Sequence, residues 1–185
     1  MITICFTGHR PDKLGGYDWN TPKNKRIMEK LKSSLIELIN STHENHFRFI
    51  CGGALGIDQM AFEICDYLKN STFKLNPIII ETILAMPFEK QACKWFKQSD
   101  VDRFNSQRSR ADEVVLVDTI EGYKLCEIDI GEYHPAKMDL RNRYMVDNSD
   151  KVFAVWNGTK GGTGNCVNYA KKKGKEIIGF NPDKI

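Results

Sequence analysis

The chain has 185 residues, 41% of them hydrophobic, and its 27 basic and 24 acidic side chains give a net charge of +3. Length and apolar content predict one domain, spanning residues 1–185, with a substantial core. The near-even charge balance argues against a dedicated nucleic-acid surface and against a membrane-seeking one. A small phosphorylated ligand suits this balance.

The sequence also argues against secretion, membrane insertion and a metal centre. The opening residues, MITICFTGHRP, become polar too early for the apolar region of a signal peptide. No apolar run approaches the roughly 18 residues that span a bilayer. The six cysteines form no CxxC pair and have no histidine at zinc-site spacing. We therefore expect a cytoplasmic protein with mostly reduced core cysteines, no metal and no cofactor.

Apolar strands and helical patterns alternate along the first half of the chain. Residues 2–7 form an apolar run that ends in Gly8-His9-Arg10-Pro11, which predicts a buried strand followed by a turn. A helical pattern runs from Ile27 to about Ser41, and another follows a short β-prone run. The expected elements after the first helix are a strand over 47–51, a helix over 57–68 and a strand over 77–87.

The alternation continues in the second half, around an irregular stretch over residues 122–135. The expected elements are a short helix over 89–96, a charged helix reaching Glu113, a strand over 114–118, a helix over 136–149, a strand over 151–156, a helix over 165–173 and a strand over 176–180. Helices alternating with apolar strands predict an α/β fold, a single Rossmann-like, doubly wound and mainly parallel sheet flanked by helices.

Two glycine-rich segments follow predicted strands and open predicted helices. They are Gly52-Gly53-Ala54-Leu55-Gly56 and Gly161-Gly162-Thr163-Gly164. Glycine allows close approach of a phosphate, and the free N–H groups at a helix start favour an anion. Strand-to-helix turns also favour glycine for geometry alone, and neither segment fits a P-loop or a GxGxxG fingerprint. Because parallel strands end at one edge, we expect both turns to meet in one crevice.

Other residues could bind a ligand or have a purely structural role. Asp58 either favours the dipole of the second helix or holds a ligand hydroxyl. His9 and Arg10 either meet a phosphate or are solvated turn residues. Trp95, on the expected short helix, is interpreted as core or lid packing. Arg143 is interpreted as a charge that faces water, and the lysines at 171–173 as partners of a helix dipole.

Four motifs in order resemble the YpsA-like branch of the SLOG superfamily: CFTGHRP at 5–11, GALGID at 53–58, MDLRNRYMVDNSD at 138–150 and GGT at 161–163. The resemblance covers residues 3 to about 178. The superfamily also contains the DprA single-stranded DNA-binding proteins and the Lonely Guy phosphoribohydrolases. The resemblance implies a Rossmann-like fold, a nucleotide or nucleotide derivative as ligand, and a homodimer.

Comparison with the Lonely Guy enzymes separates binding from catalysis. Their helix pattern M-H-x-R-K resembles residues 138–142, which places Arg141 at the arginine. Their GGxGTxxE motif resembles residues 161–168, with Asn165 for the threonine and Asn168 for the catalytic glutamate. Asparagine does not transfer a proton as a carboxylate does. The resemblance thus implies a retained phosphate cradle without the acid-base group, although Asp58 or Glu89 is open as a substitute.

We therefore expect a sensor, carrier or sequestering protein for a nucleotide-like, phosphorylated small molecule, bound at the C-terminal edge of the sheet. The alternatives are a nucleotide N-glycoside hydrolase, with Arg141 as its candidate catalytic residue, and, less favoured by the charge balance, single-stranded DNA binding or a purely structural role. The residues expected to bind the ligand are Thr7, Gly8, His9, Arg10, Gly52, Gly53, Ala54, Gly56, Asp58, Pro87, Arg141, Asn142, Gly161, Gly162, Thr163 and Asn165.

Overall fold

The apolar runs of the sequence pair side by side in a six-stranded sheet. The computed structural model describes residues 1–71 and 78–185. In the described chain every strand pairing is parallel, and the strand order is β4-β3-β2-β1-β5-β6. The strands are β1 (Ile2–Gly8), β2 (His46–Cys51), β3 (Ile79–Met86), β4 (Glu113–Leu116), β5 (Lys151–Val155) and β6 (Glu176–Phe180). The predicted α/β class and parallel sheet are confirmed.

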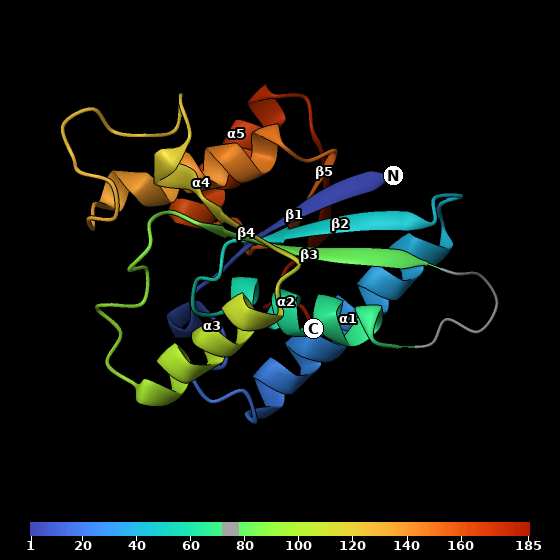
Figure 1. The fold of residues 1–185 in the computed structure, drawn as a ribbon. Helices are drawn as coiled ribbons and strands as arrows, with labels where there is room; N and C mark the ends of the chain where they lie inside the picture. Colours follow the sequence, from blue (N-terminus) through green and yellow to red (C-terminus); the bar gives the residue numbers. More distant parts are fainter. Residues whose placement is uncertain (72–77) are drawn as a thin grey trace.

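Helices cover both faces of this sheet. Figure 1 shows α1, α2 and α3 on one side of the strands and α4 and α5 on the other. The helices are α1 (Pro22–Asn40), α2 (Ile57–Lys69), α3 (Gln98–Arg110), α4 (Pro135–Asp147) and α5 (Gly162–Lys172), with short 3-10 turns η1 (Pro11–Lys13) and η2 (Val117–Thr119). This is the doubly wound arrangement that alternating strands and helices predict.

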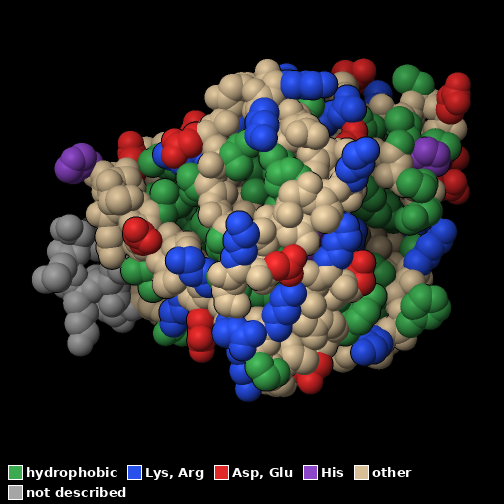
Figure 2. All heavy atoms as spheres, turned by 180° about the vertical axis from the view of Figure 1, so that it is seen from behind, with side chains coloured by type: hydrophobic (Ala, Val, Ile, Leu, Met, Phe, Trp, Pro, Cys, Tyr) green, Lys and Arg blue, Asp and Glu red, His purple; other side chains and the backbone are tan. Residues whose placement is uncertain are grey.

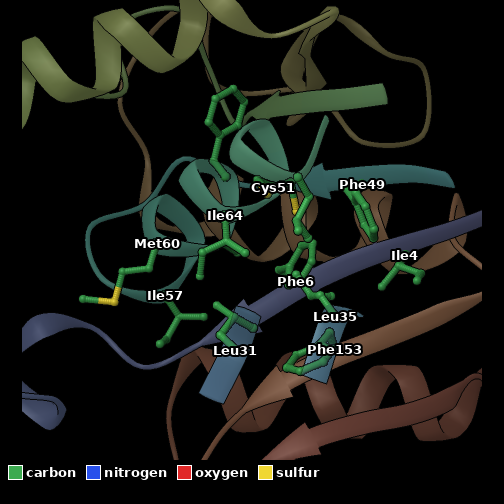
Figure 3. Packing of buried hydrophobic residues seen from close by; sticks show 14 of the residues in the cluster. Ile4, Phe6, Leu31, Leu35, Phe49, Cys51, Ile57, Met60, Ile64 and Phe153 are labelled. Carbon is green, nitrogen blue, oxygen red and sulfur yellow. The ribbon is translucent and has the colours of Figure 1, made fainter. Parts of the chain in front are cut away.

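The alternation of side chains along β1 divides the core into two layers. Ile4 and Phe6 point into a large cluster with α1 and α2, whereas Cys5 points into a second cluster with α4 and α5. Figure 3 shows the first layer, where Phe6 lies between the β2 residue Phe49 and the β5 residue Phe153. Burial on both faces explains why β1 and β5 are largely apolar along their length.

The expected helix over residues 89–96 is wrong. This segment forms consecutive turns, with backbone bonds from Cys93 N to Lys90 O and from Trp95 N to Ala92 O. Such i to i+3 bonds do not extend into the i to i+4 ladder of an α-helix. Trp95 precedes α3 and packs edge-on against Phe104 of that helix, with ring centroids 5.3 Å apart. The packing interpretation of Trp95 is therefore confirmed, but its helical placement is not.

The remaining boundaries differ by a few residues. The helix expected to begin at Asn165 starts at Gly162, because the glycine-rich segment itself forms its first turn. The strand expected to reach Asp118 ends at Leu116 and passes into η2. Pro77, the expected start of the third strand, lies outside the described residues. In the part of the chain that the structure describes, no helix is long and apolar enough to cross a membrane.

A buried ion pair holds the irregular stretch before α4 against η2. Lys137 and Asp118 have side chains only 1% exposed, and Nζ of Lys137 lies 2.9 Å from Oδ2 of Asp118. Lys137 also donates to the carbonyl of Asp129 at 2.7 Å, and the backbone N–H of Gly131 donates to Asp118 at 2.8 Å. These bonds fix the approach of the chain to the helix that carries Arg141.

We expect Asp118→Ala to lower the free energy of unfolding by about 3 to 5 kcal/mol, because it leaves the Lys137 ammonium buried and unpaired. Urea unfolding followed by circular dichroism measures this. The matched control is Asp139→Ala, which removes the exposed partner of Arg143 on the same helix and is expected to cost less than about 1 kcal/mol. Equal losses for the two variants would contradict the assignment.

Candidate functional site

A cavity of about 310 Å³ opens where β1 and β5 end. The two strands lie side by side, with Gly8 opposite Val155, so the segments that follow them begin as neighbours. The backbone N–H of His9 donates to the Val155 carbonyl at 3.2 Å, and this is the last backbone bond between the two segments. Divergence of adjacent parallel strands at their carboxyl ends is the usual origin of a ligand crevice in such folds.

Segments from four parts of the chain line this cavity. They are the turn after β1, the glycine turn before α2, the middle of α4 and the turn into α5. The lining residues are Thr7, Gly8, His9, Arg10, Asp12, Lys13, Ala54, Asp58, Met138, Arg141, Asn142, Thr159, Lys160, Gly161, Gly162 and Thr163. The structure thus brings most of the residues singled out in the sequence to one edge of the sheet.

The first turn of α5 forms one wall of the cavity. No side chain caps this helix: Gly161 is its N-cap, with φ at 143°, and Gly162 and Thr163 are its first residues. Thr163 differs from expectation, because its hydroxyl donates to the Gly8 carbonyl at 2.9 Å and so ties α5 to β1. The backbone N–H groups of this turn, rather than that hydroxyl, are the donors suited to an anion.

Two lysines that were not singled out in the sequence add positive charge to the same wall. Nζ of Lys13, from η1, donates to Oγ1 of Thr159 at 3.0 Å, and Lys160 precedes Gly161 directly. Both side chains are exposed and line the cavity, as does Arg10. Lys13 follows the turn after β1, and Lys160 lies in the turn before α5. The sequence analysis had identified both turns, and this proximity was the signal that could have revealed the two lysines. The carboxylate of Asp12 lines the cavity beside these basic side chains.

Asp58 and Arg141, which also line the cavity, form a buried ion pair. Nη1 of Arg141 donates to Oδ2 of Asp58 at 3.2 Å, and the two side chains are 4% and 9% exposed for Arg141 and Asp58. Burial raises the pKa of the Asp58 carboxyl above its ordinary value, opposed by the positive charges of Arg141 and Arg10. Burial also lowers the pKa of Arg141. The attraction between the two charges thus opposes the effect of burial on both groups.

The guanidinium of Arg141 has a hydrogen-bond donor without a partner even after it has paired with Asp58. Its Nε is buried and has no hydrogen-bond partner in the described structure. A guanidinium presents five N–H donors in a planar fork, and an unpaired buried donor is costly. Arg141 is also one of the residues that line the cavity.

The glycines of the turn before α2 have packing reasons of their own. A Cβ at Gly52 would lie 1.5 Å from Nη1 of Arg141 and 2.5 Å from Oδ2 of Asp58, so the ion pair rests directly on this residue. Gly56 has φ at 100°, and a Cβ there would lie 2.4 Å from the His9 carbonyl. Gly53 faces Phe104 and Leu84 instead of the cavity. Of the residues of this turn that were expected to bind a ligand, only Ala54 is among those that line the cavity.

Two further expected residues also lie outside the lining. Pro87 is buried directly after β3, and Asn165 is exposed on the first turns of α5. His9 lines the cavity but is only 3% exposed, so its interpretation as a solvated turn residue is wrong. Its Nε2 lies 2.6 Å from Oδ1 and 3.1 Å from the backbone nitrogen of Asn157, which joins the turns after β1 and β5.

Gln91 contacts the turn before α2, and the sequence analysis did not identify it. Its side chain is 5% exposed, and Nε2 donates to the Gly52 carbonyl at 3.0 Å. This bond fixes the peptide on which Asp58 and Arg141 rest. A glutamine in an irregular segment has no spacing that would connect it to a residue 39 positions earlier.

Of the two carboxylates considered for acid-base chemistry, Asp58 lines the cavity and Glu89 does not. Asn168, which stands at the position of the Lonely Guy glutamate, is exposed on α5 and does not line the cavity. Glu89 pairs with Arg108 at 2.7 Å and also lies outside the lining. In the described chain no group of three or more His, Cys, Asp or Glu side chains is arranged to hold a metal ion.

Comparison with known proteins places these motifs in a family. The YpsA family model, described as the YspA SLOG family, matches residues 4–181. The chain belongs to this SLOG family. The resemblance of the four motifs is thereby confirmed.

Relatives of the same kind occur in several bacteria. The chain is 41% identical to the SPbeta prophage-derived protein YoqJ of Bacillus subtilis over 88% of its own length and 91% of that protein. It is 26% identical to a UPF0398 protein of Listeria welshimeri, with 88% and 79% of the two chains covered. Neither name states a reaction.

Two solved structures share the fold of the SLOG chain. One is the X-ray structure of TM1055, with a TM-score of 0.52, 13% identity, and coverage of 96% of this chain and 72% of that one. The other is a structure of DNA processing protein A from Helicobacter pylori that concerns its single-stranded DNA binding mode. It has a TM-score of 0.54, 18% identity, and coverage of 96% and 64%. At these identities the likeness shows the fold alone.

We expect Gly52→Ala to lower the free energy of unfolding by about 3 kcal/mol, because the new methyl group displaces Arg141 and leaves Asp58 without its partner. Chemical denaturation measures the loss. Gly162→Ala is the control, because a Cβ at Gly162 meets nothing within 4 Å; its stability is expected to stay within about 1 kcal/mol of the parent. A Gly52→Ala variant as stable as the control would show that the pair does not rest on this residue.

Proposed function

We propose that this SLOG protein binds a nucleotide-derived, phosphate-bearing small molecule in the cavity at the carboxyl edge of its sheet. One observation carries the proposal: a buried Arg141, with an unpartnered Nε, lines the same cavity as the uncapped first turn of α5. A cationic fork facing a set of free backbone N–H groups is the arrangement that proteins use for phosphate oxygens.

The charges around the cavity support an anionic ligand. Four basic side chains line it against two carboxylates. The Asp58 carboxylate is neutralised by Arg141, so Arg10, Lys13 and Lys160 outweigh the remaining Asp12. The exposed positions of these three side chains allow them to move onto a ligand. Binding is therefore expected to weaken as salt concentration rises.

The competing functions have less support. N-glycoside hydrolysis needs a carboxyl group free to exchange a proton, whereas Asp58 is held in an ion pair and Asn168 lies away from the cavity. For single-stranded DNA, a positive groove with stacking aromatics is required. Figure 2 shows Lys and Arg interspersed with Asp and Glu on the face it presents. We accordingly infer binding without turnover.

Thermal-shift measurements with ADP-ribose, cyclic dinucleotides and nucleoside monophosphates test this function. A ligand present at about 100 times its Kd adds roughly 2.7 kcal/mol of stability and raises the Tm. The variant Lys160→Ala is expected to reduce the shift, since it removes an exposed cation at the cavity without touching the core. Lys172→Ala is the control and should keep the full shift, because Lys172 is exposed at the C-terminal end of α5, away from the turn that contains Lys160.

The outcomes separate binding from catalysis. No rise in Tm with any of these compounds at millimolar concentration would refute the proposed function. Chromatography of each nucleotide after overnight incubation should recover it unchanged. Release of a free base or of phosphate would instead favour the hydrolase.

A further inference from the structure

A second cavity, of about 300 Å³, lies beside the start of α3. Residues 17–20, from the loop between η1 and α1, form one side, and Lys97, Ser99, Asp100 and Arg103 form the other. It shares no described lining residue with the first cavity, at the ends of β1 and β5. Its volume lies at the lower end of the roughly 300 to 1,000 Å³ that small-molecule pockets span. The second cavity is therefore a candidate site of its own.

A buried asparagine holds the loop side of the second cavity in place. Asn24, in the first turn of α1, is 0% exposed. Its Nδ2 donates to the carbonyls of Gly16 at 2.9 Å and Asp18 at 2.7 Å, and its Oδ1 accepts from the backbone N–H of Gly15 at 2.9 Å. Three bonds from one buried amide hold this short loop in a single shape. The backbone that carries the two aromatic side chains of the loop is therefore fixed.

Each aromatic ring of the second cavity lies against a cation. Cζ of Arg103 lies 4.2 Å from the centroid of the Trp19 ring, and Nζ of Lys97 lies 5.1 Å from the centroid of the Tyr17 ring. Nη1 of Arg103 also donates to the buried Asp100 at 3.1 Å, which holds the guanidinium in position. Tyr17 is 47% exposed, so part of its ring is open to a further contact. Aromatic rings and guanidinium planes are the surfaces on which flat heterocycles stack.

The charges around the second cavity cancel. Two basic side chains, Lys97 and Arg103, line it together with two acidic ones, Asp18 and Asp100. Arg103 is paired with Asp100, and the Asp18 carboxylate accepts from the backbone N–H of Asn20 at 2.8 Å. This balance offers no excess positive charge to a phosphate or to a nucleic-acid backbone. A further cation is opposed by the two cations that already lie against the rings. An uncharged ligand suits the second cavity best.

Uncharged polar groups complete the lining. The amide of Asn20 and the hydroxyl of Ser99 both donate and accept hydrogen bonds, and both side chains are exposed. A flat ring with donors and acceptors along its edge uses the aromatic and the polar groups together, which an aliphatic ligand does not. We propose that the second cavity binds an uncharged, planar nitrogen heterocycle of the nucleobase kind, stacked on Tyr17 and on the Arg103 guanidinium. This site requires no phosphate and is independent of the function proposed for the first cavity.

Titration of the ¹⁵N-labelled protein with adenosine tests the proposal, because adenosine carries the heterocycle without a phosphate. The chain has three tryptophans, and Trp19→Phe identifies the indole N–H signal of Trp19 by its loss. Adenosine is expected to move this signal and to leave the signal of Trp156 in place, since Trp156 follows β5 and does not line the second cavity. Ribose and inorganic phosphate, which lack the heterocycle, should not move the Trp19 signal.

Tyr17→Ala should weaken adenosine binding at least about fivefold, because it removes a stacking surface. The Kd comes from the movement of the Trp19 signal. Tyr67→Ala is the matched control and should keep the Kd of the parent. Tyr67 is 55% exposed and also has a lysine, Lys32, over its ring at 3.9 Å, but it lies on α2 outside the second cavity. Since both tyrosines are exposed, both variants are expected to fold.

Three outcomes would overturn the proposal. The first is a Trp19 signal that does not move at millimolar adenosine. The second is movement of the Trp156 signal alone, which would place the heterocycle near the end of β5. The third is equal affinity of Tyr17→Ala and the parent for adenosine. None of them bears on phosphate binding in the first cavity, which the thermal-shift comparison with Lys160→Ala tests separately.

Discussion

The ion pair between Asp58 and Arg141 joins two helices that cover opposite faces of the sheet. Asp58 lies in the first turn of α2, and Arg141 lies in the middle of α4. They can meet, at 3.2 Å, because the chain bends away at the carboxyl edge and because Gly52 has no side chain to occupy the contact. Buried charges of this kind are costly unless they are paired, so the position of each helix is constrained by the other.

That constraint shapes the edge where the cavity opens. Gln91 holds the carbonyl of Gly52, Thr163 ties α5 to the end of β1, and His9 joins the turns after β1 and β5 through Asn157. Polar side chains thus take over where the ladder bonds of the sheet end. These contacts hold the segments around the cavity in place, and such preorganisation would favour the affinity of the proposed ligand.

The chemistry of the edge follows from which polar groups remain after these contacts. The hydroxyl of Thr163 and one N–H of Arg141 bond to other residues of the protein, whereas no side chain caps the first turn of α5 and Nε of Arg141 has no partner in the described structure. The exposed lysines at 13 and 160 add charge that can adapt to the ligand. A fold shared with a DNA-binding protein at 18% identity does not fix this chemistry, because such folds support many sites.

The sequence by itself determined the layers of this protein and the order of its turns. Continuous apolar runs and helical periodicity specify β1 to β6 and most of the helices, since burial repeats with the period of each element. The failure at residues 89–96 shows the limit of that signal: Phe88 and Gln91 are buried by contacts with distant segments, so the apolar spacing there did not reflect a helix. Glycine turns and motif order also predicted Thr7, Gly8, Arg10, Ala54, Arg141, Asn142 and the 161–163 turn at one edge.

Only the tertiary structure decided what each of those residues does. Gly52 was expected to admit a phosphate but makes room for Arg141, and Thr163 was expected to donate to a ligand but donates to Gly8. Lys13, Lys160 and Gln91 enter the site through contacts between segments far apart in the chain. The physical reason is that secondary structure depends on neighbours a few residues away, whereas a side chain's hydrogen-bond partner depends on distances that exist only once the sheet has assembled.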